Sequence, residues 1–154
     1  MGLAKFKTKI SVEDYLAGEE ISPVKYEYVY GEVYAMAGTS DNHNRIVNNI
    51  VARLVFHLQS SPCEPFSGDI KVRVSPHVYY YPDVLVSCEE NPESPCFRNE
   101  PILIVEVISP STQEIDQRDK LLFYQQMASV QEYVVVEQQK CWWRFIAVSR
   151  TPLG

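Results

Sequence analysis

Residues 101–112 read PILIVEVISPST, a run of aliphatic residues with a single carboxylate in its middle. Isoleucine, leucine and valine in an unbroken stretch of this length predict a buried strand. Glutamate is not favoured in strands, so the strand propensity does not explain Glu106. Bringing a lone carboxylate into an apolar region costs several kcal/mol in order of magnitude. We therefore expect a cation to neutralise Glu106.

A second acid stands at the start of the preceding apolar run, in YYYPDVLVSCEE at residues 79–90. Asp83 follows Pro82 directly, and taken alone it is also typical of a cap at a turn. Neighbouring strands lie about 4.8 Å apart, so carboxylates on two of them can converge on one divalent cation. Magnesium is commonly held by one or two carboxylates, with water and substrate phosphate completing its shell. Asp83 and Glu106 are therefore candidate ligands of Mg²⁺ or Mn²⁺.

Length and composition indicate one globular domain spanning residues 1–154. A chain of this length buries roughly 68 to 70% of the surface that its unfolded form exposes, and 45% of its residues are apolar. The formal net charge of −6 excludes a broadly basic nucleic-acid-binding surface, so any contact with phosphate must be local or assisted by a metal. No apolar run approaches the roughly 18 residues of a membrane span, and no secretory segment is recognisable, so we expect a cytoplasmic protein without a membrane contact.

Caps, turns and alternation predict a mixed α/β domain with one central sheet flanked by helices. Helices are expected over residues 11–17, from residue 40 onward, and over residues 111–127. Strands are expected in a hairpin over residues 26–38 that turns at Gly31, and over residues 70–74, 83–87, 101–108, 131–137 and 141–148. Residues 60–68 and 88–100 are expected to be loops. The apolar stripe of the second helix is expected to comprise Ile46, Val47, Ile50, Val51, Leu54 and Val55.

The cysteines and histidines do not indicate a catalytic or metal-binding role. Cys63, Cys88, Cys96 and Cys141 form no CxxC pair, and without a secretory segment we expect reduced thiols in place of disulfides or a zinc site. His43 stands in the first turn of the second helix, where capping or packing is the expected role. His57 and His77 are expected to be structural.

Three cations could stand near the two acids. Lys120 lies 14 residues after Glu106 on the helix that follows the Glu106 strand, and a helix folded back over that strand would bring its ammonium to the metal. Pairing with Asp116 four positions earlier is the alternative. Lys71 and Arg73 alternate with apolar residues on another strand, which solvent exposure explains equally well.

Several of these segments together resemble the Uma2 family, a branch of the PD-(D/E)XK restriction-endonuclease-like superfamily. They are YPDV around Asp83, VEVISPST around Glu106, and DQRDKLLFY and EYVVVE further on, preceded by YEYVYGEVYAMAG and SDNHNRIVNNI. The resemblance covers roughly residues 11–137. It implies a restriction-endonuclease-like core in which Asp83 and Glu106 are the two metal-binding acids.

The resemblance also bears on the remaining site residues. The superfamily pattern has a lysine two residues after the second acid, where this chain has Ile108, and the resemblance implies that Lys120 takes its place. Glu27 matches a recurrent acid of the early hairpin, which implies an accessory ligand or a base, although cross-strand pairing or exposure would also suit that position. Relatives continue beyond the last strand, so we expect a domain shortened at its C-terminus, with Trp142 and Trp143 exposed or docked on a partner.

The resulting prediction is a Mg²⁺- or Mn²⁺-dependent endonuclease that hydrolyses phosphodiester bonds of nucleic acid, with DNA as the expected substrate. Asp83, Glu106, Lys120 and Glu27 are its predicted site residues, and a homodimer is a further expectation. One alternative is an inactive interaction module of the same fold, which the acidic charge and Ile108 favour. Another is a metal-dependent hydrolase of a small phosphorylated molecule.

Overall fold

The computed structural model describes residues 8–108, 114–139 and 143–147. The helices are α1 (Val12–Ile21), α2 (Asp41–His57) and α3 (Glu114–Gln126). The strands are β1 (Tyr26–Val29), β2 (Glu32–Ala35), β3 (Glu64–Ser67), β4 (Lys71–Ser75), β5 (Val78–Tyr80), β6 (Val84–Ser87), β7 (Phe97–Arg98), β8 (Pro101–Ile108), β9 (Glu132–Glu137) and β10 (Trp143–Ala147).

The strands form two sheets of five, which we call the first and the second sheet. The first has the order β2-β1-β5-β4-β7, and the second has the order β10-β9-β8-β6-β3. The expected mixed α/β architecture is therefore present, but the expectation of one central sheet is wrong. The strand expected over residues 83–87 is β6 in the second sheet, whereas β5, before the break at residues 81–83, was not expected and belongs to the first sheet. Proline at position 82 interrupts the ladder because it has no N–H to donate.

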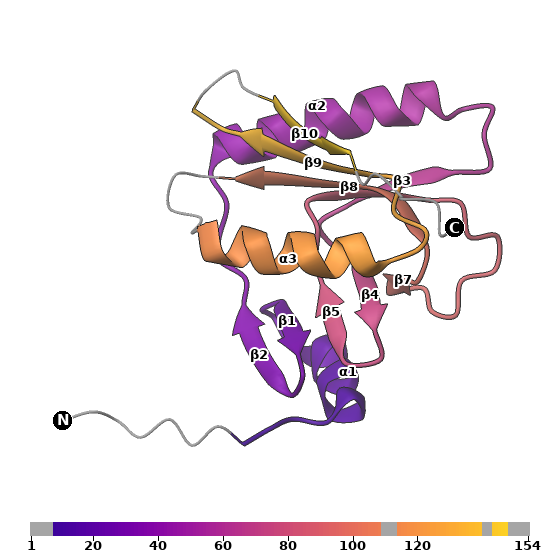
Figure 1. Ribbon diagram of the computed structural model, residues 1–154. Coiled ribbons are helices and arrows are strands. Elements are labelled where there is room, and N and C mark those ends of the chain that lie inside the picture. Colours follow the sequence, from indigo (N-terminus) through magenta and orange to yellow (C-terminus); the bar gives the residue numbers. More distant parts are fainter. Residues whose placement is uncertain (1–7, 109–113, 140–142, 148–154) are drawn as a thin grey trace, which may run out of the picture.

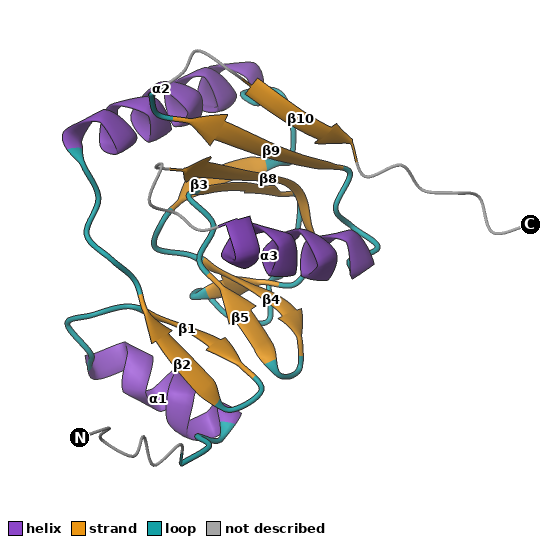
Figure 2. Cartoon of the chain, turned by 60° about the vertical axis from the view of Figure 1, so that its left-hand side comes forward, coloured by secondary structure: helices purple, strands orange, loops and turns teal. Residues whose placement is uncertain are grey.

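Helices and sheets alternate as layers (Figures 1 and 2). Helix α1 packs on the outer face of the first sheet through Tyr15, Tyr28 and Tyr79. Helix α3 lies between the two sheets, and α2 covers the outer face of the second sheet. The molecule thus has a middle layer, occupied by α3, into which one face of each sheet points.

Strand alternation determines which side chains enter that middle layer. Successive residues of a strand point to opposite faces. In β5, Tyr79 packs toward α1, while Val78 and Tyr80 pack in the core around α3. In β8, Val105 packs toward α2 and Ile104 toward α3. Strands β5 and β8 thus each send alternate side chains into the core around α3.

Helix α2 begins where the cap predicted it. The Ser40 hydroxyl accepts a hydrogen bond from the backbone N–H of His43, which satisfies one of the free N–H groups of the first turn. The expected stripe packs on the second sheet except for Val55, which is 50% exposed. Val55 follows Ile46 by nine residues, two and a half helical turns, and so lies on the opposite side of the helix.

The hairpin β1–β2 turns at Tyr30 and Gly31 as expected, with register partners Val29 and Glu32 on either side. Both turn residues have positive φ, 47° at Tyr30 and 92° at Gly31. Two consecutive positive values are typical of the tight type I′ turn, whose twist matches that of the strands it joins.

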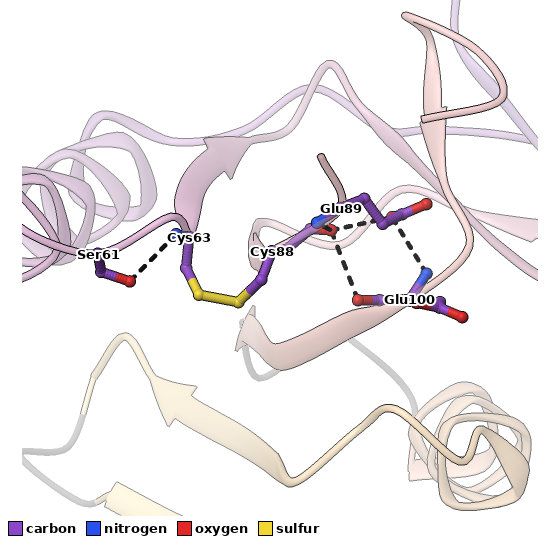
Figure 3. Close-up of a disulfide and its surroundings, with 6 residues drawn as sticks. Ser61, Cys63, Cys88, Glu89 and Glu100 are labelled. Carbon is purple, nitrogen blue, oxygen red and sulfur yellow. Dashed lines mark hydrogen bonds between the residues drawn. A yellow bond between two sulfur atoms is a disulfide. The ribbon is translucent and has the colours of Figure 1, made fainter. Parts of the chain in front are cut away.

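Both expected loops contain a strand, and a disulfide joins the two loops. Strand β3 lies in residues 60–68, and the short β7 lies in residues 88–100. Cys63 and Cys88 are joined by a disulfide (Figure 3), so the expectation of reduced thiols is wrong for this pair. The antiparallel register explains it, because Glu64 pairs with Ser87 and the next residues outward are the two cysteines. Cys96 is free and exposed.

Some expectations fall outside the described residues. They include the Ser111 cap, Cys141 and Trp142, and no side chain of β10 is described either. Within the described part of the chain, the helices are too short or too polar for any of them to cross a bilayer.

Gly31 tests the hairpin turn. A Cβ at this position would lie 2.9 Å from Lys9 Cβ, in addition to the strain of φ 92°. We expect Gly31→Ala to lower the free energy of unfolding by more than about 1 kcal/mol. Gly18 lies inside α1, where an added Cβ would meet nothing within 4 Å, so Gly18→Ala should raise stability by about 0.5 to 1 kcal/mol. Urea unfolding of both variants measures the difference, and equal effects of the two substitutions would contradict the turn.

The disulfide gives a second prediction. Closing a loop with a sequence separation of 25 residues stabilises a protein by about 3 kcal/mol in the chain-entropy model. We expect the double substitution Cys63→Ser with Cys88→Ser to lower the free energy of unfolding by this order, and Cys96→Ser to leave it unchanged. Labelling of all four cysteines by a thiol reagent in denatured, unreduced protein would show that the bond is absent.

Candidate active site

Two buried glutamates enter the middle layer from opposite sheets. In β1, Tyr28 packs toward α1, so its neighbour Glu27 points the other way, toward α3. In β8, Val105 and Val107 pack toward α2, so Glu106 between them also points toward α3. Each glutamate is only 8% exposed. Strand alternation in two separate sheets thus brings both carboxylates into one layer.

Lys120 of α3 lies between these two acids. Its ammonium Nζ is 2.9 Å from Glu27 Oε1 and 3.8 Å from Glu106 Oε1. Lys120 precedes the fully buried Tyr124 by four residues, and residues at this spacing share one face of a helix. The inward face of α3 therefore carries the Lys120 ammonium at the point where the two sheets place the carboxylates of Glu27 and Glu106. The side chain of Asp116, the alternative partner, is outside the described set.

Glu27 is also held by the backbone. The N–H of Tyr81 donates to Glu27 Oε1 at 3.0 Å, so the same oxygen accepts from Tyr81 and from Lys120. A buried carboxylate that accepts several hydrogen bonds keeps one orientation. Glu27 is thus a fixed acceptor that places the Lys120 ammonium, in contrast to the exposed hairpin residue that the sequence also allowed.

Asp83 stands at the junction of β6 and β8. It directly precedes Val84, the first residue of β6, which pairs with Val105 of β8. The N–H of Val107 donates to Asp83 Oδ2 at 2.6 Å, and the carbonyl of Asp83 accepts from the N–H of Gly68. Just before β6 begins, the Asp83 carboxylate thus accepts the hydrogen bond of a β8 N–H.

The sequence did not assign His43 to this group. Its Nε2 lies 3.0 Å from Asp83 Oδ1, and the exposed fractions of the two side chains are 12% and 16%. The backbone N–H of His43 belongs to the cap of α2, as expected, but its side chain contacts a predicted site residue. A histidine in the first turn carries no local signal for this contact, because its partner lies 40 positions away in the sequence.

The other two candidate cations belong elsewhere. Lys71 is 5% exposed, contrary to the solvent-exposed alternative, and donates to the Tyr81 hydroxyl at 3.0 Å. Burial lowers the pKa of its ammonium, and the charge of Glu19 opposes this effect. The Arg73 Nη1 group donates to both carboxylate oxygens of Glu93, at 3.0 and 2.9 Å. Neither contact involves the four predicted site residues directly.

Tyr124 lines the same cluster. Its side chain is fully buried, and its hydroxyl has no hydrogen-bond partner among the described residues. Burial raises the pKa of this hydroxyl, and the negative charges of Glu106 and Glu27 raise it further. The phenol therefore stays neutral and adds no charge beside the acids.

The donor set fits a hard divalent cation. Glu106 offers carboxylate oxygens from β8, and Asp83 offers them from the residue before β6, where it accepts from the N–H of Val107. Magnesium commonly takes one or two carboxylates from a protein. Asp83, Glu106, Glu27 and Lys120 together hold three carboxylates and one ammonium, so a divalent cation would bring their formal charge to zero. No group of three or more His, Cys, Asp or Glu side chains arranged for a metal is found in the described ranges.

A hollow of about 670 Å³ lies away from this cluster, on α2. Its lining comprises Asn49, Ala52, Arg53, Leu54, Phe56 and His57. None of the predicted site residues contributes to it, so its shape does not bear on their chemistry.

Comparison with known proteins found a matching family model and similar sequences. The Uma2 family model, described as "Putative restriction endonuclease", matches residues 12–145. Two uncharacterized proteins of Synechocystis sp., slr1290 and sll1609, are 38% identical over 130 residues and 35% identical over 136 residues. These matches cover 83% and 85% of this chain and 68% and 77% of the relatives.

A solved structure shares the fold. It is the crystal structure of "a putative nuclease belonging to DUF820" from Anabaena variabilis, with a TM-score of 0.68 and 16% sequence identity. The superposition covers 90% of this chain and 84% of the other. At this identity the likeness concerns the fold, and it supports the restriction-endonuclease-like core expected from the sequence.

Lys120 provides a test of the buried cluster. Removing one partner of a buried ion pair costs about 3 to 5 kcal/mol, because a charge is left buried without it. We expect Lys120→Met to lower the free energy of unfolding by this order, and the double variant Lys120→Met with Glu27→Gln to recover part of the loss. Arg118→Met, on an exposed position of the same helix, is the matched control. Unfolding curves in urea that coincide for Lys120→Met and Arg118→Met would contradict the cluster.

Proposed function

This chain belongs to the Uma2 family, and from that membership and the acid–lysine cluster we propose that it is a metal-dependent endonuclease. Family membership supports a nuclease-like function. The proposed reaction is hydrolysis of phosphodiester bonds in nucleic acid, DNA in the first instance, with water as the nucleophile. Mg²⁺ or Mn²⁺ is the proposed cofactor.

One observation carries the proposal. The Asp83 carboxylate, directly before β6, accepts from the N–H of Val107, the residue after Glu106 on β8, and Lys120 of α3 lies 3.8 Å from Glu106. Two carboxylates beside an ammonium suit metal-dependent hydrolysis of a phosphodiester, in which carboxylates hold a cation and an ammonium stabilises negative charge on phosphate. An ion pair with a purely structural role would need only one acid beside Lys120, without a second carboxylate close to Glu106.

Asp83 and Glu106 would hold the cation. When bound, the ion would make water a better nucleophile near neutral pH and stabilise charge on the phosphate. Lys120 orients the attacking water or donates to a phosphate oxygen, and Glu27, fixed by the Tyr81 N–H, keeps the ammonium in place. The lysine thus comes from α3, while position 108, where the superfamily pattern has it, is isoleucine.

The net charge of −6 limits how substrate can bind. A broadly basic surface supplies most of the affinity of ordinary DNA-binding proteins. In this protein, phosphate recognition is local and depends on the cation and on Lys120. We therefore expect activity to rise with metal concentration and cleavage to fall steeply when EDTA is added.

The decisive assay offers plasmid DNA, single-stranded DNA and RNA with Mg²⁺ or Mn²⁺. We expect cleavage by the wild type, background levels for Asp83→Asn and for Glu106→Gln, and a loss of about 10²- to 10³-fold for Lys120→Met. Asp119→Asn, an exposed acid beside Lys120, is the control that should retain full activity. Each variant should be shown to be folded by circular dichroism.

Other outcomes would point to the alternatives. A folded wild type that cleaves none of the three substrates, with either metal, contradicts the nuclease proposal and favours an interaction module. Hydrolysis of a small phosphate ester without cleavage of nucleic acid would favour a phosphatase-like activity of the same acids.

A further inference from the structure

The contact between His43 and Asp83 joins the first turn of α2 to the proposed cation site. His43 Nε2 lies 3.0 Å from Asp83 Oδ1. A carboxylate offers only acceptors, so the imidazole nitrogen that faces it must carry the proton and donate. Both side chains are largely withdrawn from solvent, so little water competes for the bond.

Asp83 is therefore anchored at both of its oxygens. Oδ1 accepts from the His43 imidazole, and Oδ2 accepts from the backbone N–H of Val107, the residue after Glu106. Two donors on two different elements fix the plane of a carboxylate, which one donor alone leaves free to rotate about its χ2 bond. The direction of the remaining lone pairs is then set by the protein.

His43 is itself held in place from two sides. Its backbone N–H donates to the cap hydroxyl of Ser40, and that hydroxyl donates to Gln138 Oε1 at 3.0 Å. The Asn42 side chain donates to the carbonyl of Gln138 at 3.0 Å. The first turn of α2 is thus tied to the residue that follows β9, at the end of the second sheet where β8 also ends.

We propose that His43 is a positioning residue, which orients the Asp83 carboxylate for cation binding. The inference rests on the proposed function for its purpose, but its geometry stands on contacts that exist without a cation. Groups that hydrogen-bond to a metal-ligating carboxylate fix its orientation, and removing one costs about 10- to 100-fold in metal affinity or activity. His43 has this relation to Asp83.

The first experiment reads the orientation of Asp83 without any metal. The Val107 amide is a reporter, because its N–H donates to Asp83 Oδ2. In ¹H–¹⁵N spectra of the metal-free protein, we expect His43→Ala to shift the Val107 amide proton and to speed its exchange with solvent. His43→Gln, whose side-chain amide can still donate, should restore the wild-type signal in large part. His57→Ala, at the far end of the same helix, should leave it unchanged.

The second experiment measures Mn²⁺ affinity by electron paramagnetic resonance of the free ion, which needs no substrate. We expect the dissociation constant to rise about 10- to 100-fold in His43→Ala, with recovery in His43→Gln and no change in His57→Ala. Cleavage assays on the same proteins should show the loss at limiting metal and a smaller one at saturating metal.

The outcomes separate this inference from the proposed function. Equal Mn²⁺ affinities for His43→Ala and the wild type, or an unmoved Val107 amide, overturn the positioning role alone. A wild type that binds Mn²⁺ with the expected dependence on His43 but cleaves no nucleic acid contradicts the nuclease proposal and supports the positioning role. A wild type that binds no Mn²⁺ overturns both.

Discussion

The arrangement of this protein depends on one ammonium shared by two buried glutamates that come from different sheets. Glu27 and Glu106 both point into the layer between the sheets, where a carboxylate without a cation would be costly, and Lys120 lies within ion-pair distance of each. This requirement fixes the position of α3, because its inward face must carry both the lysine and the apolar residues that fill the core. The layered order of helices and sheets follows from meeting both demands at once.

Local patterns were sufficient for most elements and insufficient for their assembly. Three local patterns predicted a structure that is present: the Ser40 cap, the turn at Gly31 and the aliphatic run of β8. The division into two sheets had no comparable signal, because the run through Tyr79 and Val84 is apolar on both sides of Pro82. Similarly, Cys63 and Cys88 become neighbours only through the β3–β6 register, which the sequence does not display.

The candidate site divides in the same way. Glu106 was identifiable because an acid in an aliphatic strand contradicts its surroundings. Asp83 at the start of a second apolar run and Lys120 on the following helix were candidates from the sequence as well, and the family resemblance added Glu27. The structure brings Glu27, Glu106 and Lys120 together and sets Asp83 beside them, while their catalytic roles stay predictions. His43 was missed because helix caps are common and a long-range partner leaves no trace in the local sequence. Its contact with Asp83 emerges only when α2 is placed on the second sheet.

The separation in sequence between Glu27 and Lys120, 93 positions, has a consequence for how the chain folds. Bringing such distant residues together costs loop-closure entropy before any contact offsets it, and contacts of this kind form slowly. The Lys120 ammonium can contact both Glu27 and Glu106 only after the first sheet, the second sheet and α3 have all docked. We expect the cluster to be among the last features completed during folding, so an intermediate that lacks either sheet would also lack the contacts between Lys120 and both glutamates.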